Sequence, residues 1–127
     1  MAQNSVGDVK VESNIDGISV YADAMIEKVL YNLVDNSLRH GRDVTTLSLN
    51  RMMDGSTLVV EYTDNGVGVP AENKELIFKR GFGSNTGLGL FLTREILAIT
   101  GMEIAETGVN GVRFEIRVPP GRYRIDT

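Results

Sequence analysis

The chain has 127 residues, no cysteine and a formal net charge of −4. This composition excludes disulfides and cysteine-based metal sites, and it disfavours attraction to nucleic acid or to an anionic membrane. The length predicts one domain over residues 1–127, with flexible ends at 1–8 and 119–127. Residues 1–7 do not resemble a signal peptide, and no apolar run reaches the ~18 residues that span a bilayer.

Two short strands are predicted at the start of the chain. Residues 9–14 alternate apolar and polar side chains, and residues 19–22 form a second apolar run. Asp16-Gly17 lies between them and is a hairpin signal, so we expect the two strands to pair antiparallel.

A long amphipathic helix is predicted over residues 24–40, with Asp23 as its N-cap and Gly41 at its end. Apolar residues share one arc of this helix, namely Ile26, Val29, Leu30, Leu33, Val34 and Leu38. The polar arc carries Lys28, Asn32, Asn36 and Arg39.

The two asparagines on the polar arc, Asn32 and Asn36, are spaced i, i+4 and therefore lie one above the other. Asparagine is a poor helix former because its side chain competes for backbone hydrogen bonds. The pair is either an oxygen donor site for a hard cation such as Mg²⁺, beside Arg39 for phosphate, or an ordinary solvated helix face. His40, the single histidine, is either a partner of the helix C-terminal dipole or a catalytic group.

The next two strands are predicted at residues 45–52 and 57–63, joined by the hairpin signal Asp54-Gly55. The second strand places Asp64 at its C-terminal end, where a loop is held by the sheet. Asp64 either caps the Asn65-Gly66 turn or accepts a hydrogen bond from an exocyclic amine such as that of adenine.

Six of the fourteen glycines fall between Asp64 and Leu90. Within this stretch, residues 72–78 predict two short helical turns, and residues 79–84 predict a mobile basic loop. Phe78 and Phe82, spaced i, i+4, either anchor the root of this loop in the core or dock when a ligand binds.

The last third of the chain predicts a helix over residues 88–100, ended by Gly101, and two strands over 102–107 and 112–118. Val112, Phe114, Ile116 and Val118 point to one side of the second strand, which Pro119-Pro120 ends. The helix opens on Gly87-Leu88-Gly89-Leu90, and a glycine-rich helix N-terminus binds anions through its free N–H groups and its dipole.

The order of these motifs over residues 9–118 resembles the ATP-binding catalytic domain of sensor histidine kinases. These domains belong to a superfamily that also holds gyrase, heat-shock chaperone and mismatch-repair ATPases. The resemblance implies an α/β (α+β) two-layer sandwich of the Bergerat type. In that fold a mixed, mostly antiparallel sheet of about five strands lies under about three helices.

The resemblance also implies the residues of the site. Residues 32–36 look like the N box, residues 64–68 and 87–90 like the two glycine boxes, and residues 77–82 like the F box. The implied catalytic set is Asn36, Asn32, Arg39 and His40, with Asn36 as the Mg²⁺ ligand. The implied nucleotide contacts are Asp64 on the adenine amino group, with Gly66, Gly68, Phe78, Lys79, Arg80, Phe82, Thr86, Gly87, Leu88, Gly89 and Leu90.

Asn32 stands where the hydrolytic members, such as gyrase, carry a water-activating glutamate. An asparagine does not take a proton, so the resemblance favours phosphoryl transfer to a protein side chain over ATP hydrolysis. The expected acceptor is a histidine on a separate dimerisation domain, and through it a response regulator. Nothing in this chain resembles that acceptor domain.

Two alternatives remain at this point, an anti-sigma-factor-type serine kinase and a non-catalytic nucleotide-sensing module of the same fold. We expect ATP or ADP and Mg²⁺ as ligands, no nucleic-acid partner and no direct membrane insertion by this domain. We expect a cytoplasmic location, either alone or as the cytoplasmic portion of a larger membrane-bound sensor.

Overall fold

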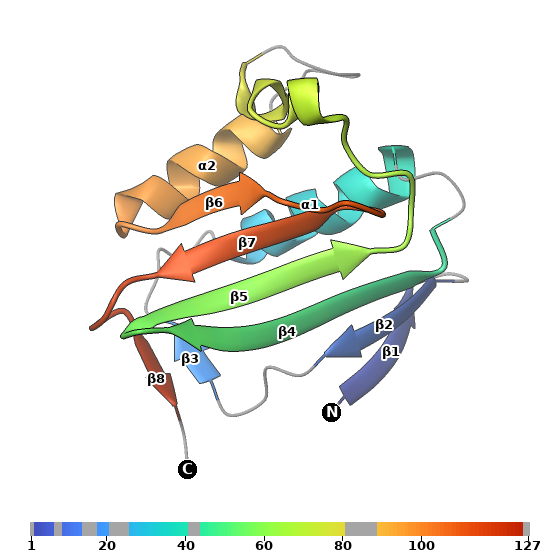
Figure 1. The fold of residues 1–127 in the computed structure, drawn as a ribbon. Coiled ribbons are helices and arrows are strands. Elements are labelled where there is room, and N and C mark those ends of the chain that lie inside the picture. Colours follow the sequence, from blue (N-terminus) through green and yellow to red (C-terminus); the bar gives the residue numbers. More distant parts are fainter. Residues whose placement is uncertain are drawn as a thin grey trace.

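A six-stranded sheet forms one layer of the structure, a computed structural model that describes residues 2–6, 9–13, 18–20, 26–40, 44–80 and 89–125 (Figure 1). The strand order is β1 (Ala2–Val6), β2 (Val9–Ser13), β4 (Thr46–Asp54), β5 (Thr57–Asp64), β7 (Arg113–Val118) and β6 (Glu103–Glu106). All neighbouring pairs are antiparallel except β2 and β4, which run parallel. The predicted mixed, mostly antiparallel sheet is thus confirmed, with six strands in place of about five.

The helices form the second layer on one face of this sheet (Figure 1). In the described part of the chain they are α1 (Ile26–His40), α2 (Gly89–Ile99) and the 3-10 turns η1 (Ala71–Asn73) and η2 (Leu76–Phe78). The two short turns predicted over residues 72–78 are therefore present. Asp23 and Gly41, the expected caps of the first helix, lie outside the described residues.

The core lies between the two layers, and the alternation of β7 explains how that strand contributes to it. Val112, Phe114, Ile116 and Val118 are all buried, as their period of two predicts. Between β4 and β5, Asp54 pairs with Thr57, and the predicted hairpin turns at Gly55 with a φ of 62°. Glycine adopts this left-handed conformation without the steric cost that a Cβ imposes.

The apolar arc predicted for α1 is partly wrong. Val29 and Leu33 are fully buried, but Leu30 and Leu38 are 40% and 47% exposed, and Ser37 takes a buried place. The helix therefore turns an i, i+4, i+8 stripe toward the sheet. Apolar periodicity could not identify Ser37 as buried, because its burial depends on a hydrogen-bond partner from a distant strand.

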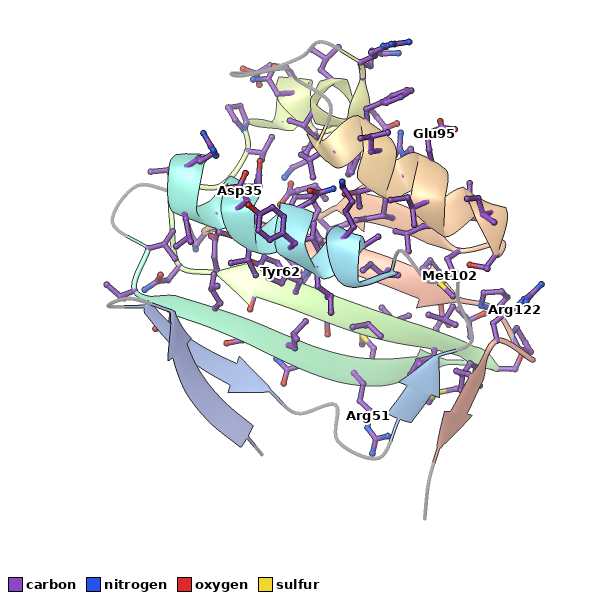
Figure 2. The ribbon with its side chains drawn as sticks, turned by 180° about the vertical axis from the view of Figure 1, so that it is seen from behind. Asp35, Arg51, Tyr62, Glu95, Met102 and Arg122 are labelled. Carbon is purple, nitrogen blue, oxygen red and sulfur yellow. The ribbon has the colours of Figure 1, made fainter. Side chains whose placement is uncertain are left out.

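That partner is Tyr62 on β5, which lies between α1 and the sheet (Figure 2). Its hydroxyl lies 2.8 Å from Ser37 Oγ and donates to the Leu33 carbonyl at 3.1 Å. Burial raises the pKa of the Tyr62 phenol above its ordinary value, the Ser37 hydrogen bond opposes this rise, and the charge of Asp64 adds to it. A neutral phenol therefore ties the helix to the sheet.

The hairpin expected between residues 9–14 and 19–22 is wrong. β2 pairs with β1 and β4, whereas β3 (Ile18–Val20) pairs with β8 (Tyr123–Ile125) in a separate two-stranded sheet. Asp16-Gly17 is a local turn signal, and it does not reveal that both edges of β2 are used by other strands.

Both segments expected to be flexible ends contain a strand, β1 in residues 1–8 and β8 in residues 119–127. After Pro119-Pro120 the chain turns at Gly121, whose φ is 89°, and Tyr123 donates its hydroxyl to the Ser56 carbonyl at 2.8 Å. Among the helices that the structure describes, none has the length and apolar character needed to cross a bilayer.

Candidate functional site

Asp64 is a buried carboxylate at the end of β5, and its two oxygens have different surroundings. Oδ1 accepts hydrogen bonds from the backbone N–H of Gly66 at 2.9 Å and of Val112 at 3.1 Å. Asp64 is only 6% exposed, so water has little access to it. Its Oδ2 is buried and has no hydrogen-bond partner within the described residues. An unpartnered buried oxygen is costly unless a ligand supplies the donor. Oδ1 therefore caps the turn, while Oδ2 remains an acceptor without a donor among the described residues.

Close backbone packing holds Asp64 from behind. Gly111, with a φ of 85°, sits so near that a Cβ there would lie 2.2 Å from the Asp64 carbonyl oxygen. A Cβ on Gly68, whose φ is 77°, would lie 3.0 Å from the Gly111 carbonyl oxygen. Only glycine combines these φ values with such close approach. The glycine-rich turns therefore fix the carboxylate as well as bend the chain.

A second buried carboxylate, Glu106 at the end of β6, lies at the same end of the sheet. Its Oε2 accepts from the backbone N–H of Gly108 at 3.0 Å and of Arg113 at 2.9 Å, and its Oε1 pairs with the Lys74 ammonium. Lys74 Nζ also donates to the Gly108 carbonyl at 2.9 Å. Sequence reasoning missed this cluster, because 32 residues separate its two charges.

Asn65 was also missed as a structural residue. Its Oδ1 accepts from the N–H groups of Thr45 and Thr46 at 2.9 and 3.1 Å, and its Nδ2 donates to Thr45 Oγ1 at 2.7 Å. The turn after Asp64 is thereby fastened to the start of β4. The Asn-Gly signal predicted the turn but not this contact.

On α1, the predicted pair Asn32 and Asn36 is half-buried on both residues. Asn32 Nδ2 donates to the Gly89 carbonyl at 3.1 Å and to Thr93 Oγ1 at 3.2 Å, both on α2. The amide therefore links the two helices, so the interpretation of a purely solvated face is wrong for Asn32. Arg39 Nε donates to both carboxylate oxygens of Asp35 at 3.0 Å, one turn back on the same helix.

Gly89, the first residue of α2, is exposed. No described atom lies within 4 Å of a Cβ built on Gly89. Glycine stabilises a helix less than alanine does, and no close neighbour requires a glycine at this position. The first N–H groups of a helix have no intrahelical partner, so a helix start of this kind is suited to an anion.

Phe78 ends η2, and its side chain lies in the core. This ring is 3% exposed, packs edge-on against Phe114 with centroids 6.1 Å apart, and carries the Arg94 guanidinium 4.1 Å from its centroid. The arrangement supports Phe78 as a core anchor at the root of the loop. Beyond it, Lys79 and Arg80 are exposed, and Arg80 lies 5.8 Å from the Phe91 ring.

A hollow of about 570 Å³ lies beside this site, lined by residues 67–71, Lys74, Gly108 and Val109. Its lining does not include Asp64. The described residues contain no group of three or more His, Asp or Glu side chains placed to hold a metal ion.

The structure brings one end of α1, the end of β5 and the start of α2 to one side of the molecule (Figure 1). Asn32, Asn36, Arg39, Asp64, Gly66, Gly68, Gly89 and Leu90 belong to these elements or to the turn after β5. Phe82, Thr86, Gly87 and Leu88 lie outside the described residues, as does most of the loop expected to be mobile, and the side chain of His40 is not described.

Comparison with known proteins identifies relatives of this chain. The model of the family described as "Histidine kinase-, DNA gyrase B-, and HSP90-like ATPase" matches residues 22–122. Sensor protein kinase PilS of Pseudomonas aeruginosa is 42% identical over 79 residues, 56% of this chain and 15% of PilS. The alginate biosynthesis sensor protein KinB of the same species is 33% identical over 104 residues, 74% of this chain and 17% of KinB.

Solved structures show the same fold. The catalytic domain of histidine kinase ThkA, in a nucleotide-free form, has a TM-score of 0.69 at 29% identity and covers 86% of this chain and 76% of ThkA's. The mycobacterial sensor histidine kinase MprB has a TM-score of 0.77 at 21% identity, over 89% of this chain and 83% of its own. The chain spans only about a sixth of the length of PilS and KinB.

Proposed function

Because the chain belongs to the family of histidine kinase-, DNA gyrase B- and HSP90-like ATPases, we propose that it is the ATP-binding catalytic domain of a sensor histidine kinase. It holds Mg·ATP and donates the γ-phosphoryl group to a histidine on a separate dimerisation domain. That histidine in turn passes the phosphoryl group to a response regulator. The domain acts in the cytoplasm, as a portion of a longer sensor.

The observation that carries this proposal is the unpartnered Oδ2 of Asp64. A buried carboxylate oxygen is an acceptor only, and the exocyclic amine of adenine is a donor. The Gly66 and Val112 N–H groups hold Oδ1, so the side chain is oriented before a ligand arrives. A base with a carbonyl at the same position would place its oxygen, an acceptor, against Oδ2, which also only accepts.

The phosphate end of the site is supported by the start of α2. No described atom crowds the Cβ position of Gly89, which leaves room for a phosphate there, and the helix N-terminus would stabilise its charge. Lys79 and Arg80 are exposed at the root of the preceding loop and add positive charge. Gly87, Leu88 and Thr86 are the further expected contacts of the triphosphate, with Phe82 in the loop.

Asn36 provides the oxygen that fits Mg²⁺, since its amide is a neutral hard ligand on a half-buried helix face. The bound ion would supply charge neutralisation at the phosphates. Arg39, held by Asp35, and His40 complete the polar end of α1. In the transfer, a nitrogen of the acceptor histidine forms the new bond to the γ-phosphorus. The bond to the bridging oxygen breaks, and ADP leaves with the electron pair.

Calorimetric titration of the protein with Mg·ATP and Mg·ADP tests the first half of the proposal, with one site of micromolar to millimolar affinity expected. Mixing the protein, labelled ATP and the helical acceptor domain from the same gene tests the second, with label expected on the acceptor. If neither nucleotide binds, the proposed function is wrong.

A further inference from the structure

A three-residue polar cluster joins α1 to the first turn of α2. Asn32 Nδ2 donates to the Gly89 carbonyl and to Thr93 Oγ1, and Thr93 Oγ1 lies 2.9 Å from the same Gly89 carbonyl. Thr93 is fully buried, with no exposed surface. Asn32 and Gly89 are 57 residues apart in sequence, so this contact exists only in the folded state.

The donors and acceptors of this cluster allow one arrangement. The Gly89 carbonyl only accepts, so the single hydroxyl proton of Thr93 points to it. The Thr93 oxygen is then the acceptor for Asn32, and the two protons of the Asn32 amide serve one partner each. The flipped amide would turn Oδ1 toward the Gly89 oxygen, acceptor against acceptor.

The cluster requires an amide donor at position 32. A carboxylate at this position has no proton for the Gly89 carbonyl and would face its oxygen. An asparagine here therefore has a use beyond being an inert replacement for a base.

The geometry points to Asn32 as a positioning residue, and this inference rests on the proposed function for the identity of the ligand. Asn36 lies one turn further along α1, about 6 Å away along the axis. By holding Gly89, Asn32 sets the distance between the helix that carries the Mg²⁺ ligand and the helix N-terminus that receives the phosphates. Asn32 acts through the backbone of α2.

Four single variants, together with the double variant Asn32→Ala/Thr93→Val, separate this role from direct contact with nucleotide. Asn32→Ala removes the link, Thr93→Val removes the buried hydroxyl while keeping the shape, and Thr93→Ser keeps the hydroxyl. Lys28→Ala, an exposed change one turn earlier on α1, is the control. Each is titrated with Mg·ATP and with adenosine, which lacks phosphates, and the amide resonances of Gly89 to Thr93 are recorded without ligand.

We expect Asn32→Ala to weaken Mg·ATP about five- to tenfold while adenosine affinity stays unchanged. Thr93→Val should show part of this loss, the double variant no more than Asn32→Ala, and Thr93→Ser and Lys28→Ala none. The same α2 amide resonances should shift in Asn32→Ala and Thr93→Val.

A loss in Asn32→Ala that Thr93→Val does not share would overturn the inference in favour of direct contact. Equal losses for ATP and adenosine would overturn it in favour of a general structural role. If the wild-type protein binds no nucleotide, the proposed function fails. The ligand-free resonances then decide the link between the helices, and unshifted α2 amides refute it.

Discussion

Asp64 and Glu106 make the same backbone contacts at the same end of the sheet. Each accepts from the N–H of the glycine two residues later, Gly66 or Gly108, and from an N–H at the start of β7. They differ in the second oxygen, which Lys74 neutralises in Glu106 and which has no partner among the described residues in Asp64. Both oxygens of Glu106 have partners within the described residues, whereas Asp64 keeps one free acceptor, which we propose binds the adenine amine.

Asp64→Asn should weaken Mg·ATP by about 1.5–3 kcal/mol with little change in melting temperature. The asparagine oxygen keeps the contacts to Gly66 and Val112, so its NH₂ group replaces Oδ2 and faces the adenine amine, donor against donor. Inosine triphosphate, which has a carbonyl there, should lose less affinity or gain. Calorimetry with both nucleotides measures this, and unchanged ATP affinity would reduce Asp64 to a turn cap.

Gly89→Ala should separate stability from binding. Alanine is the better helix former and has room at this position, so thermal stability should stay equal or rise by up to about 1 kcal/mol. Affinity for Mg·ATP should fall, because the methyl group enters the space proposed for phosphate. Glu95→Ala, at an exposed α2 side chain (Figure 2), is the control and should leave binding unchanged. Undiminished ATP binding by Gly89→Ala would count against the phosphate site.

Lys74→Met should destabilise the fold more than the double change Lys74→Met/Glu106→Gln. The single change leaves the fully buried Glu106 charge without its cation, whereas the double change removes the charge as well. We expect about 1–3 kcal/mol for the single variant, below the value for a fully buried pair, because Lys74 keeps some solvent access. Urea unfolding of the wild type, Lys74→Met, Glu106→Gln and the double variant measures the coupling between the two residues. Losses of the two single variants that add up to the loss of the double variant would disprove it.

Folding stability should fall as the pH rises above about 10, and Tyr62 should cause part of that loss. The folded-state pKa of Tyr62 is raised, so the unfolded chain gives up this proton first, and each unit of pH above the ordinary value of 10.0 favours unfolding. Tyr62→Phe should be less stable at pH 8, through lost bonds to Ser37 and Leu33, but less sensitive to alkali. Urea unfolding at pH 8 to 11 tests this, with the exposed Tyr31→Phe retaining the wild-type slope.

Asn36→Ala should abolish phosphoryl transfer to the acceptor domain, because the amide that would hold Mg²⁺ at the phosphates is lost. Hydrolysis of ATP by the wild-type domain alone should be slow, since Asn32 provides no base. Labelled ATP with and without the acceptor measures both. Rapid phosphate release that the acceptor does not affect would refute the kinase assignment.

Local patterns predicted the parts of the fold that depend on neighbouring residues. The period-two burial of β7, the hairpin at Gly55 and the helix end at Gly101, whose φ is 75°, are confirmed. Long-range pairing was not predictable in this way, and the partners of β2 and β3 were wrong for that reason. A strand's alternation fixes which side chains face the core but does not name the neighbouring strand.

The site divides in the same way. The placement of Asp64 at a strand end and of the asparagines on a helix face was predictable because these are local signals, and their roles toward a ligand stay predictions. Ser37, Lys74 and Glu106 were missed, since each is explained only by a contact between segments that are distant in sequence. Burial of a polar side chain is decided by its partner, and the partner is not visible in periodicity.

The backbone packing behind Asp64 also bears on how relatives of this chain should be read. A Cβ on Gly108 or Gly111 would come within 2.3 Å of a backbone oxygen, so these positions are constrained by the fold whether or not nucleotide binds. Under the proposed function, the carboxylate at position 64 carries the additional constraint of binding adenine. A homologue that keeps both glycines but has lost the acid would therefore be a folded domain released from adenine recognition. Such homologues are the ones in which to look for nucleotide-independent descendants of this domain.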